Sequence, residues 1–138
     1  MVLTVMKYVG LAIVFVWFFW GGINHFTQPQ FFLAIMPPWV PFHEAAVWLS
    51  GAFEIVGALA LWVPRLRAAA GWGLIALTVL VTPANVYMWQ NPELFPDVSQ
   101  TFLTGRLVVQ VVLLALIWWS TRPSAPREAS VTSAPQAG

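Results

Sequence analysis

A single carboxylate, Glu54, lies near the middle of an apolar segment, residues 48–63, that is long enough to cross a bilayer. An ionised side chain in hydrocarbon costs roughly 2.5–3.5 kcal/mol on insertion scales, so Glu54 must be protonated, paired or in contact with a wet cavity. Small residues three and four positions away on the same helix face would let another helix approach closely: Ser50, Gly51, Gly57 and Ala58. We therefore expect the carboxylate to point into a helix bundle and to mark a site.

Arg106 is a cation in the first turns of the last apolar segment, and Gln110 lies one turn deeper on the same helix face. An unpaired cation inside a membrane is costly, and Glu54 is the deepest acid available to it. We predict that Arg106 and Glu54 are coupled as a pair. The alternative is that such a pair only fixes the register of the helices.

The other two apolar segments also carry polar groups. Thr78, Thr82 and Asn85 form one stripe on a helix that Pro83 should kink, and this stripe should face Glu54. At 1.5 Å per residue, Glu54 lies roughly 14 Å below the outer interface, and Asn85 and Arg106 about 6–8 Å. We predict a ligand-binding cluster, open towards the outside, that comprises His25, Glu54, Thr82, Asn85, Arg106 and Gln110.

This cluster does not have the composition of a metal site. One histidine and one acid at different depths lack the ligand number and spacing of zinc and iron sites, and the second histidine, His43, falls on a connection. Simpler interpretations remain open for two members. His25 would then be a polar residue at headgroup level, and Asn85 would only satisfy the carbonyl that the kink frees.

Composition excludes a soluble domain. Of 138 residues, 59% are hydrophobic and only 8% are charged, which leaves too little polar surface to face water. The net charge of +1 gives no reason to expect a nucleic-acid partner. The chain has no cysteine, so its own residues form no disulfide and no thiolate metal site. We expect a polytopic membrane protein surrounded by lipid.

The apolar pattern predicts an all-α transmembrane four-helix bundle over residues 1–120, with helices at about 3–24, 44–63, 68–90 and 102–120. The first connection, residues 24–44, contains four prolines that break helix. Its short apolar run, residues 31–36, should lie at the interface, where it could cap the bundle. Residues 121–138 are rich in proline, serine and alanine, which is typical of a disordered tail.

Charge predicts the orientation of the bundle. Basic residues fall on one side of the four-helix topology: Lys7, Arg65, Arg67, Arg122 and Arg127. Acidic residues fall in the opposite connections: Glu44, Glu93 and Asp97. Because positive charge is concentrated in cytoplasmic segments, we expect a multi-pass protein with both termini in the cytoplasm.

Four segments together suggest a family. GGINHFTQPQFFLAIMPPWVP, SGAFEIVGALALWVPRLRAAAGWGL, TPANVYMWQNP and RLVVQ follow one another in that order. Across most of residues 15–120 the chain resembles the DoxX-like small membrane proteins. The resemblance implies a four-helix protein of the cell inner membrane, with founding relatives associated with quinone-linked sulfur oxidation.

Three classes of function are compatible with these residues. The first is a binding or accessory subunit linked to redox metabolism, whose pocket holds a quinone-like molecule by Glu54, Asn85 and Arg106. The second is a membrane enzyme in which Glu54 acts as acid or base while Arg106 stabilises negative charge. The third is a structural subunit or a proton-coupled transporter, which would need a homodimer or another membrane subunit. No cofactor motif is evident in the sequence, and a bound quinone or lipid is the candidate cofactor.

Overall fold

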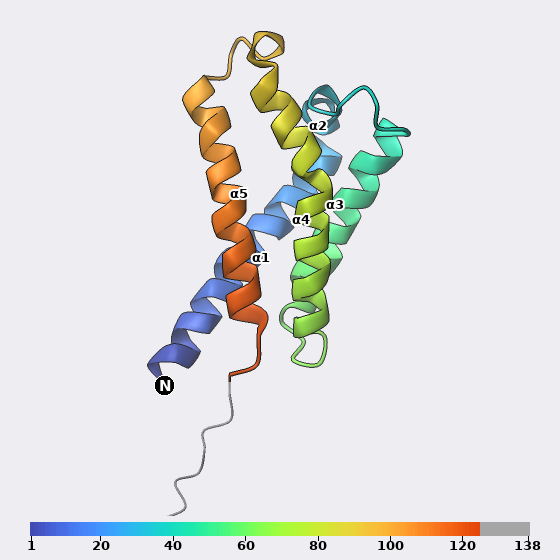
Figure 1. Ribbon diagram of the computed structural model, residues 1–138. Coiled ribbons are helices and arrows are strands. Elements are labelled where there is room, and N and C mark those ends of the chain that lie inside the picture. The colour runs from blue at the N-terminus through green and yellow to red at the C-terminus, as the bar shows by residue number, and fades with distance from the viewer. Residues whose placement is uncertain (125–138) are drawn as a thin grey trace, which may run out of the picture.

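Helices make up the framework of the computed structural model, which describes residues 1–124. The four long helices are α1 (Val2–Thr27), α3 (His43–Ala60), α4 (Arg67–Gln90) and α5 (Gln100–Thr121) (Figure 1). A short helix, α2 (Pro29–Ala34), lies between α1 and α3, and a 3-10 turn, η1 (Pro92–Leu94), lies between α4 and α5. No strand occurs within residues 1–124. The prediction of an all-α chain is confirmed.

Three of the helices, α1, α4 and α5, are long and apolar enough to cross a membrane. These three helices support the expectation of a membrane protein. The remaining long helix, α3, has 18 residues and carries His43, Glu44, Ser50 and Glu54, which lower its mean hydropathy.

The connections differ from the expected ones in detail. The proline-rich segment after α1 contains α2, because Pro29 suits the first turn of a helix, and Ile35 directly after α2 is buried. At the other end α3 stops at Ala60, and residues 61–66 form turns before α4. Arg67 fixes this turn by donating from Nε to the carbonyl oxygen of Leu61 at 2.9 Å. Of the expected disordered tail, residues 125–138 lie outside the described residues.

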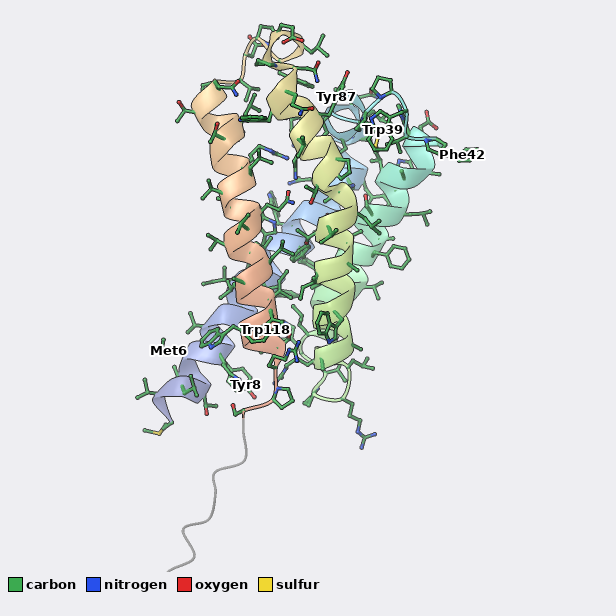
Figure 2. The ribbon with its side chains drawn as sticks, viewed as in Figure 1. Met6, Tyr8, Trp39, Phe42, Tyr87 and Trp118 are labelled. Carbon is green, nitrogen blue, oxygen red and sulfur yellow. The ribbon has the colours of Figure 1, made fainter. Side chains whose placement is uncertain are left out.

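Basic and aromatic side chains gather at one end of the bundle. The N-terminus, the turn between α3 and α4 and the end of α5 lie together there, and we call it the basic end (Figure 1). Lys7 donates from Nζ to the carbonyl oxygen of Arg122 at 2.9 Å, and the Arg122 guanidinium lies 4.8 Å from the Trp72 ring centroid. At the opposite end, which we call the α2 end, Trp39 and Phe42 project into the surroundings (Figure 2).

The long helices pack as two pairs. α1 packs mainly against α3, and α4 packs mainly against α5. The pairs meet in an apolar core towards the basic end, formed by Leu11, Val14, Phe18, Ala58, Leu61, Leu74, Leu113 and Ile117. A smaller cluster at the α2 end joins Ile35, just after α2, to Met88 of α4 and Leu103 of α5. The first cluster holds the two pairs together, and the second joins the α2 segment to the α4/α5 pair.

Glycines bring α1 and α3 into backbone contact. A Cβ added to Gly51 would lie 2.5 Å from the Cβ of His25 and 3.1 Å from the carbonyl oxygen of Gly22. The small-residue face of α3 therefore contacts another helix closely, as predicted from the sequence. The same contact fixes how far α3 is shifted along α1. Gly51 lies level with His25, so α3 begins about 12 Å beyond that level, at 1.5 Å per residue. The extra turns of α3 rise beside α2.

Candidate functional site

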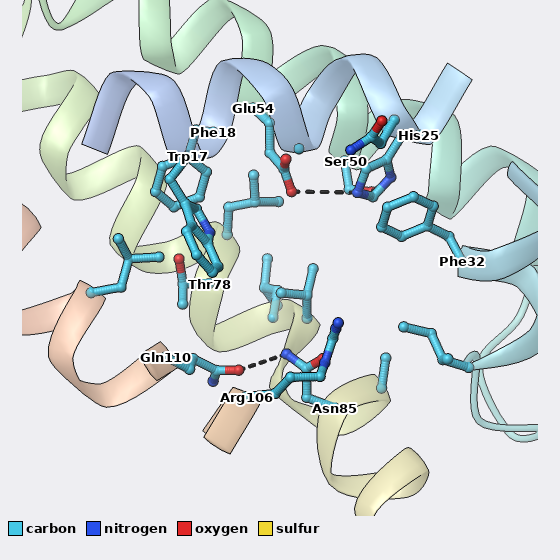
Figure 3. A pocket seen from close by; sticks show the side chains of 18 of the residues that line it. Trp17, Phe18, His25, Phe32, Ser50, Glu54, Thr78, Asn85, Arg106 and Gln110 are labelled. Carbon is cyan, nitrogen blue, oxygen red and sulfur yellow. Dashed lines mark hydrogen bonds and ion pairs between the residues drawn. The ribbon is translucent and has the colours of Figure 1, made fainter. Parts of the chain in front are cut away.

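A cavity of about 1640 Å³ lies between the α1/α3 pair and the α4/α5 pair (Figure 3). Residues of all five α-helices line it, and most of the lining is apolar. The polar side chains fall into two groups on opposite walls: the first joins α1 to α3, and the second joins α4 to α5. Clefts of this kind, mostly apolar with a few placed polar groups, are where small molecules bind.

The first group is centred on His25, a buried residue near the end of α1. Its Nε2 lies 3.4 Å from Oε1 of Glu54, and its Nδ1 lies 2.8 Å from the carbonyl oxygen of Val47. Ser50 Oγ lies 3.1 Å from the same Nδ1 and itself donates to Val47. The ring also stacks on Phe32 of α2, with centroids 3.7 Å apart. His25 is thus held by α2, α3 and its own helix.

The contact of Nδ1 with a carbonyl oxygen indicates the tautomer of the His25 ring. The Val47 carbonyl oxygen can only accept, so Nδ1 of His25 carries a hydrogen and donates it. Nε2 then faces the Glu54 carboxyl with a lone pair unless one of the two groups is protonated there. A hydrogen bond between Nε2 and Oε1 would need a proton on one of the two groups. The contact places an acid beside a base at the wall of the cavity.

Gly21 makes room for the acid. A Cβ at this position would lie 2.7 Å from Oε2 of Glu54, so any larger residue would displace the carboxyl group. The Glu54 side chain is 12% exposed and points into the space between the helix pairs (Figure 3). The prediction that this carboxylate points into the bundle is confirmed.

The second group is a directional chain of hydrogen bonds. Arg106 donates from Nη2 to Oδ1 of Asn85 at 2.8 Å, and Asn85 donates from Nδ2 to Oε1 of Gln110 at 2.7 Å. Gln110 in turn donates from Nε2 to Thr82 Oγ1, and Thr82 donates to the carbonyl oxygen of Thr78 at 2.8 Å. Each link fixes the orientation of the previous one, so the chain orients Arg106. All of these residues except Thr82 line the cavity.

The structure thus divides the predicted cluster between two walls, and the predicted pairing of Glu54 with Arg106 is wrong. Glu54 contacts His25, and within residues 1–124 no carboxylate lies within 4.0 Å of the Arg106 guanidinium. The polar stripe on α4 bonds to α5, and it does not contact Glu54. The cause is the glycine crossing, which brings α1 against α3 and gives the acid a nearer partner.

Sequence reasoning missed several contributors to the site. The sequence pattern marks Ser50 only as a small residue, although its position one turn before Glu54 places its hydroxyl on the same face. Phe31 and Phe32 of α2 approach Arg106 and His25, and nothing in their spacing indicated this. Gly105 lines the cavity and would allow a Cβ with no atom within 4 Å. In the described part of the chain, no group of three or more histidine or acidic residues could hold a metal ion.

Comparison with known proteins corrects the expected family. No curated protein and no solved structure matches the chain. The resemblance to DoxX-like proteins is not supported: a different family model, described as Domain of unknown function (DUF8561), matches residues 11–121, and no DoxX family matches. The expectation of a DoxX-like protein is therefore wrong, and the chain belongs to the DUF8561 family.

Proposed function

We propose that this chain is a membrane binding protein that holds a lipophilic small molecule by an oxygen-bearing head group, as a quinone-binding site would. The observation that carries the proposal is the pair of polar groups facing one another across a large, otherwise apolar cavity. Packing of the helices alone would not need both polar groups. Arg106 supplies donors to a head-group oxygen from one wall, the His25–Glu54 pair gives the opposite wall its polar character, and apolar side chains hold the remainder.

The same proposal includes the membrane topology. In it α3 spans as the fourth helix, because its 18 residues extend about 27 Å and pack along α1. Both termini are cytoplasmic in the inner membrane, since Lys7, Arg67 and Arg122 gather at the basic end. The α2 helix then partly covers the cavity at the outer side.

Cysteine labelling tests this topology in a chain that has no cysteine of its own. Single cysteines replacing Gln28 and Pro96, both exposed at the α2 end, should react with an impermeant maleimide added outside intact cells. A cysteine replacing Arg65, in the turn after α3, should react only after the membrane is permeabilised, because α3 carries that turn across. Reaction of positions 28 and 65 from the same side would show that α3 does not cross.

Filling the cavity tests binding. We expect Gly105→Trp to abolish the thermal stabilisation that a decyl-chain quinone gives the purified protein, because the new ring occupies the space beside Arg106. Gly73→Trp is the matched control, since it also adds an indole to a helical glycine with no neighbour within 4 Å but lies outside the cavity lining. Both variants should fold, because replacing a helical glycine by a better helix former is favourable.

The control variant decides the outcome of this experiment. Equal stabilisation of wild type, Gly105→Trp and Gly73→Trp would place the quinone elsewhere and contradict binding in the cavity. Loss of stabilisation in Gly105→Trp alone supports it. Mass spectrometry of lipids that co-purify with the three proteins gives the same comparison for the native occupant.

An enzyme is the second candidate, favoured by one observation. His25 and Glu54 place a base beside an acid at the wall of the cavity, and general acid–base catalysis uses side chains of this kind. The two candidate functions differ in whether the bound molecule leaves the cavity unchanged. An enzyme releases the molecule chemically changed, and Glu54→Gln would then retain binding but yield only unchanged molecule on extraction.

A further inference from the structure

Arg106 is a cation at the cavity wall that no acid of residues 1–124 neutralises. Its only hydrogen bond within this range is the one to Asn85, a neutral amide, and its buried Nε has no hydrogen-bond partner there. Its Cζ lies 5.7 Å from the centroid of the Phe31 ring, which supplies only a weak electrostatic contact. Glu54, the acid that lines the same cavity, is already engaged by His25 on the opposite wall.

The hydrogen-bond chain beside Arg106 turns the guanidinium towards the cavity. Asn85 cannot rotate to offer Arg106 its amide nitrogen without breaking its bond to Gln110, which is itself fixed by Thr82. Figure 3 shows the guanidinium pointing into the space between the two walls. A guanidinium has five N–H donors in a planar fork, and this one uses a single donor within the described chain. The remaining donors suit an oxyanion that accepts two parallel bonds.

The apolar part of the cavity follows α1 away from this polar region. Its lining includes one stripe of α1 whose members are each more than half exposed: Val9, Ile13, Val16, Trp17 and Trp20. From Trp20 to Val9 the stripe extends about 16 Å at 1.5 Å per residue. Residues that line a cavity and are also exposed on a membrane helix lie where that cavity opens sideways to lipid. A hydrocarbon chain can therefore lie along α1 while its head group remains beside Arg106.

We propose that the ligand of this site is an amphiphile with an anionic oxygen head group, a carboxylate or a phosphate, drawn from the surrounding membrane. This rests on the proposed function, and adds the charge and the source of the ligand. The hydrocarbon chain gains little by leaving lipid, because lipid is as apolar as the cavity wall. Affinity must therefore come from the head group, and the unneutralised guanidinium is the strongest partner the cavity offers to it.

Four ligands of graded chemistry test the charge of the head group in nanodiscs of neutral lipid. They are oleate, oleoyl lysophosphatidate, oleyl alcohol and a decyl-chain quinone. We expect one or both anions to bind the wild type at least about tenfold more tightly than the alcohol, as a charge-assisted hydrogen bond implies. The stronger anion identifies the source as a fatty acid or as a lipid phosphate.

Variants of Arg106 test whether this residue causes the preference for anions over the alcohol. Arg106→Gln should weaken binding of the preferred anion by about 10- to 100-fold and leave the alcohol unchanged. Arg106→Lys keeps the charge without the fork and should retain a part of the preference. Should Arg106→Gln fail to fold, the comparison of both anions with oleyl alcohol on the wild type still tests the charge of the head group, and Arg106→Lys tests the role of the guanidinium.

The possible failures are distinguishable. Equal affinity of the wild type for anions, alcohol and quinone, all abolished by Gly105→Trp, would overturn the anionic head group and leave the binding function standing. A preference for anions that Arg106→Gln does not reduce would also overturn this proposal. Binding of none of the four ligands, or binding that Gly105→Trp does not change, would overturn the proposed function itself.

Discussion

Replacing Glu54 with leucine is expected to lower the free energy of unfolding by about 3–5 kcal/mol, the usual cost of breaking a buried pair by removing one partner. His25, which is 6% exposed, would be left with Nε2 facing apolar surroundings. His25→Leu should destabilise the protein for the reciprocal reason. The double variant should lose clearly less than the sum of the two, with an interaction energy above about 1 kcal/mol. Denaturation in mixed detergent micelles measures all three.

The matched control cycle combines Glu54→Leu with Arg106→Gln. These two side chains lie on opposite walls and share no contact, so their effects should add within about 0.5 kcal/mol. A large interaction energy in this cycle, with none between His25 and Glu54, would mean that the acid pairs with Arg106 after all.

Gly51→Ala should be the other severe substitution. Its new methyl group would meet the Cβ of His25 at 2.5 Å, and both atoms are fixed to helix backbones, so α1 and α3 must move apart. Overpacking of this kind costs about 1–3 kcal/mol, and here it also lengthens the contact between His25 and Glu54. We expect a lower melting temperature together with loss of ligand stabilisation.

Gly73→Ala is the control for that substitution. It makes the same change within α4, where the added methyl group meets nothing within 4 Å. Its effect should be neutral or stabilising by up to about 1 kcal/mol, from helix propensity alone. Equal melting temperatures for Gly51→Ala and Gly73→Ala would contradict the backbone contact between α1 and α3.

Two physical rules, the periodicity of an α-helix and the cost of charge in hydrocarbon, predicted much of the fold and of the site. The long apolar segments are helices, and the glycine face of α3 is a contact face. All six predicted site residues lie on the cavity or bond directly to a residue that lines it. These features depend on the spacing of residues within one helix, which can be counted in the sequence.

Pairing across the cavity could not be predicted in the same way, because it depends on how far one helix slides along another. Depths counted from a common interface put Glu54 several ångströms below Arg106 and far below His25. The stagger of α3 brings Glu54 within one turn of the level of His25, since Gly51 is level with His25. The point where α1 and α3 cross is set by how their glycines fit together in three dimensions. The spacing of residues along the sequence does not give this fit.

The mistaken family has a related physical origin. Prolines beside aromatic residues at an interface, small residues on a helix face and a few buried polar groups recur in membrane bundles because lipid imposes the same constraints on all of them. Segments such as residues 21–41 and 82–92 satisfy those constraints. Features of this kind do not distinguish one family from another, whereas the family model over residues 11–121 identifies DUF8561.

The short helix α2 touches both walls at once, since Phe32 stacks on His25 and Phe31 lies beside Arg106. Six residues are too few to hold a helix in water without outside contacts, so the protection of its amides depends on those two neighbours. Hydrogen–deuterium exchange at the amide of Ile35, which donates to the Phe31 carbonyl, therefore reports on the state of the whole cavity. Slower exchange there on adding a ligand would register occupancy of the interior from a segment near the surface.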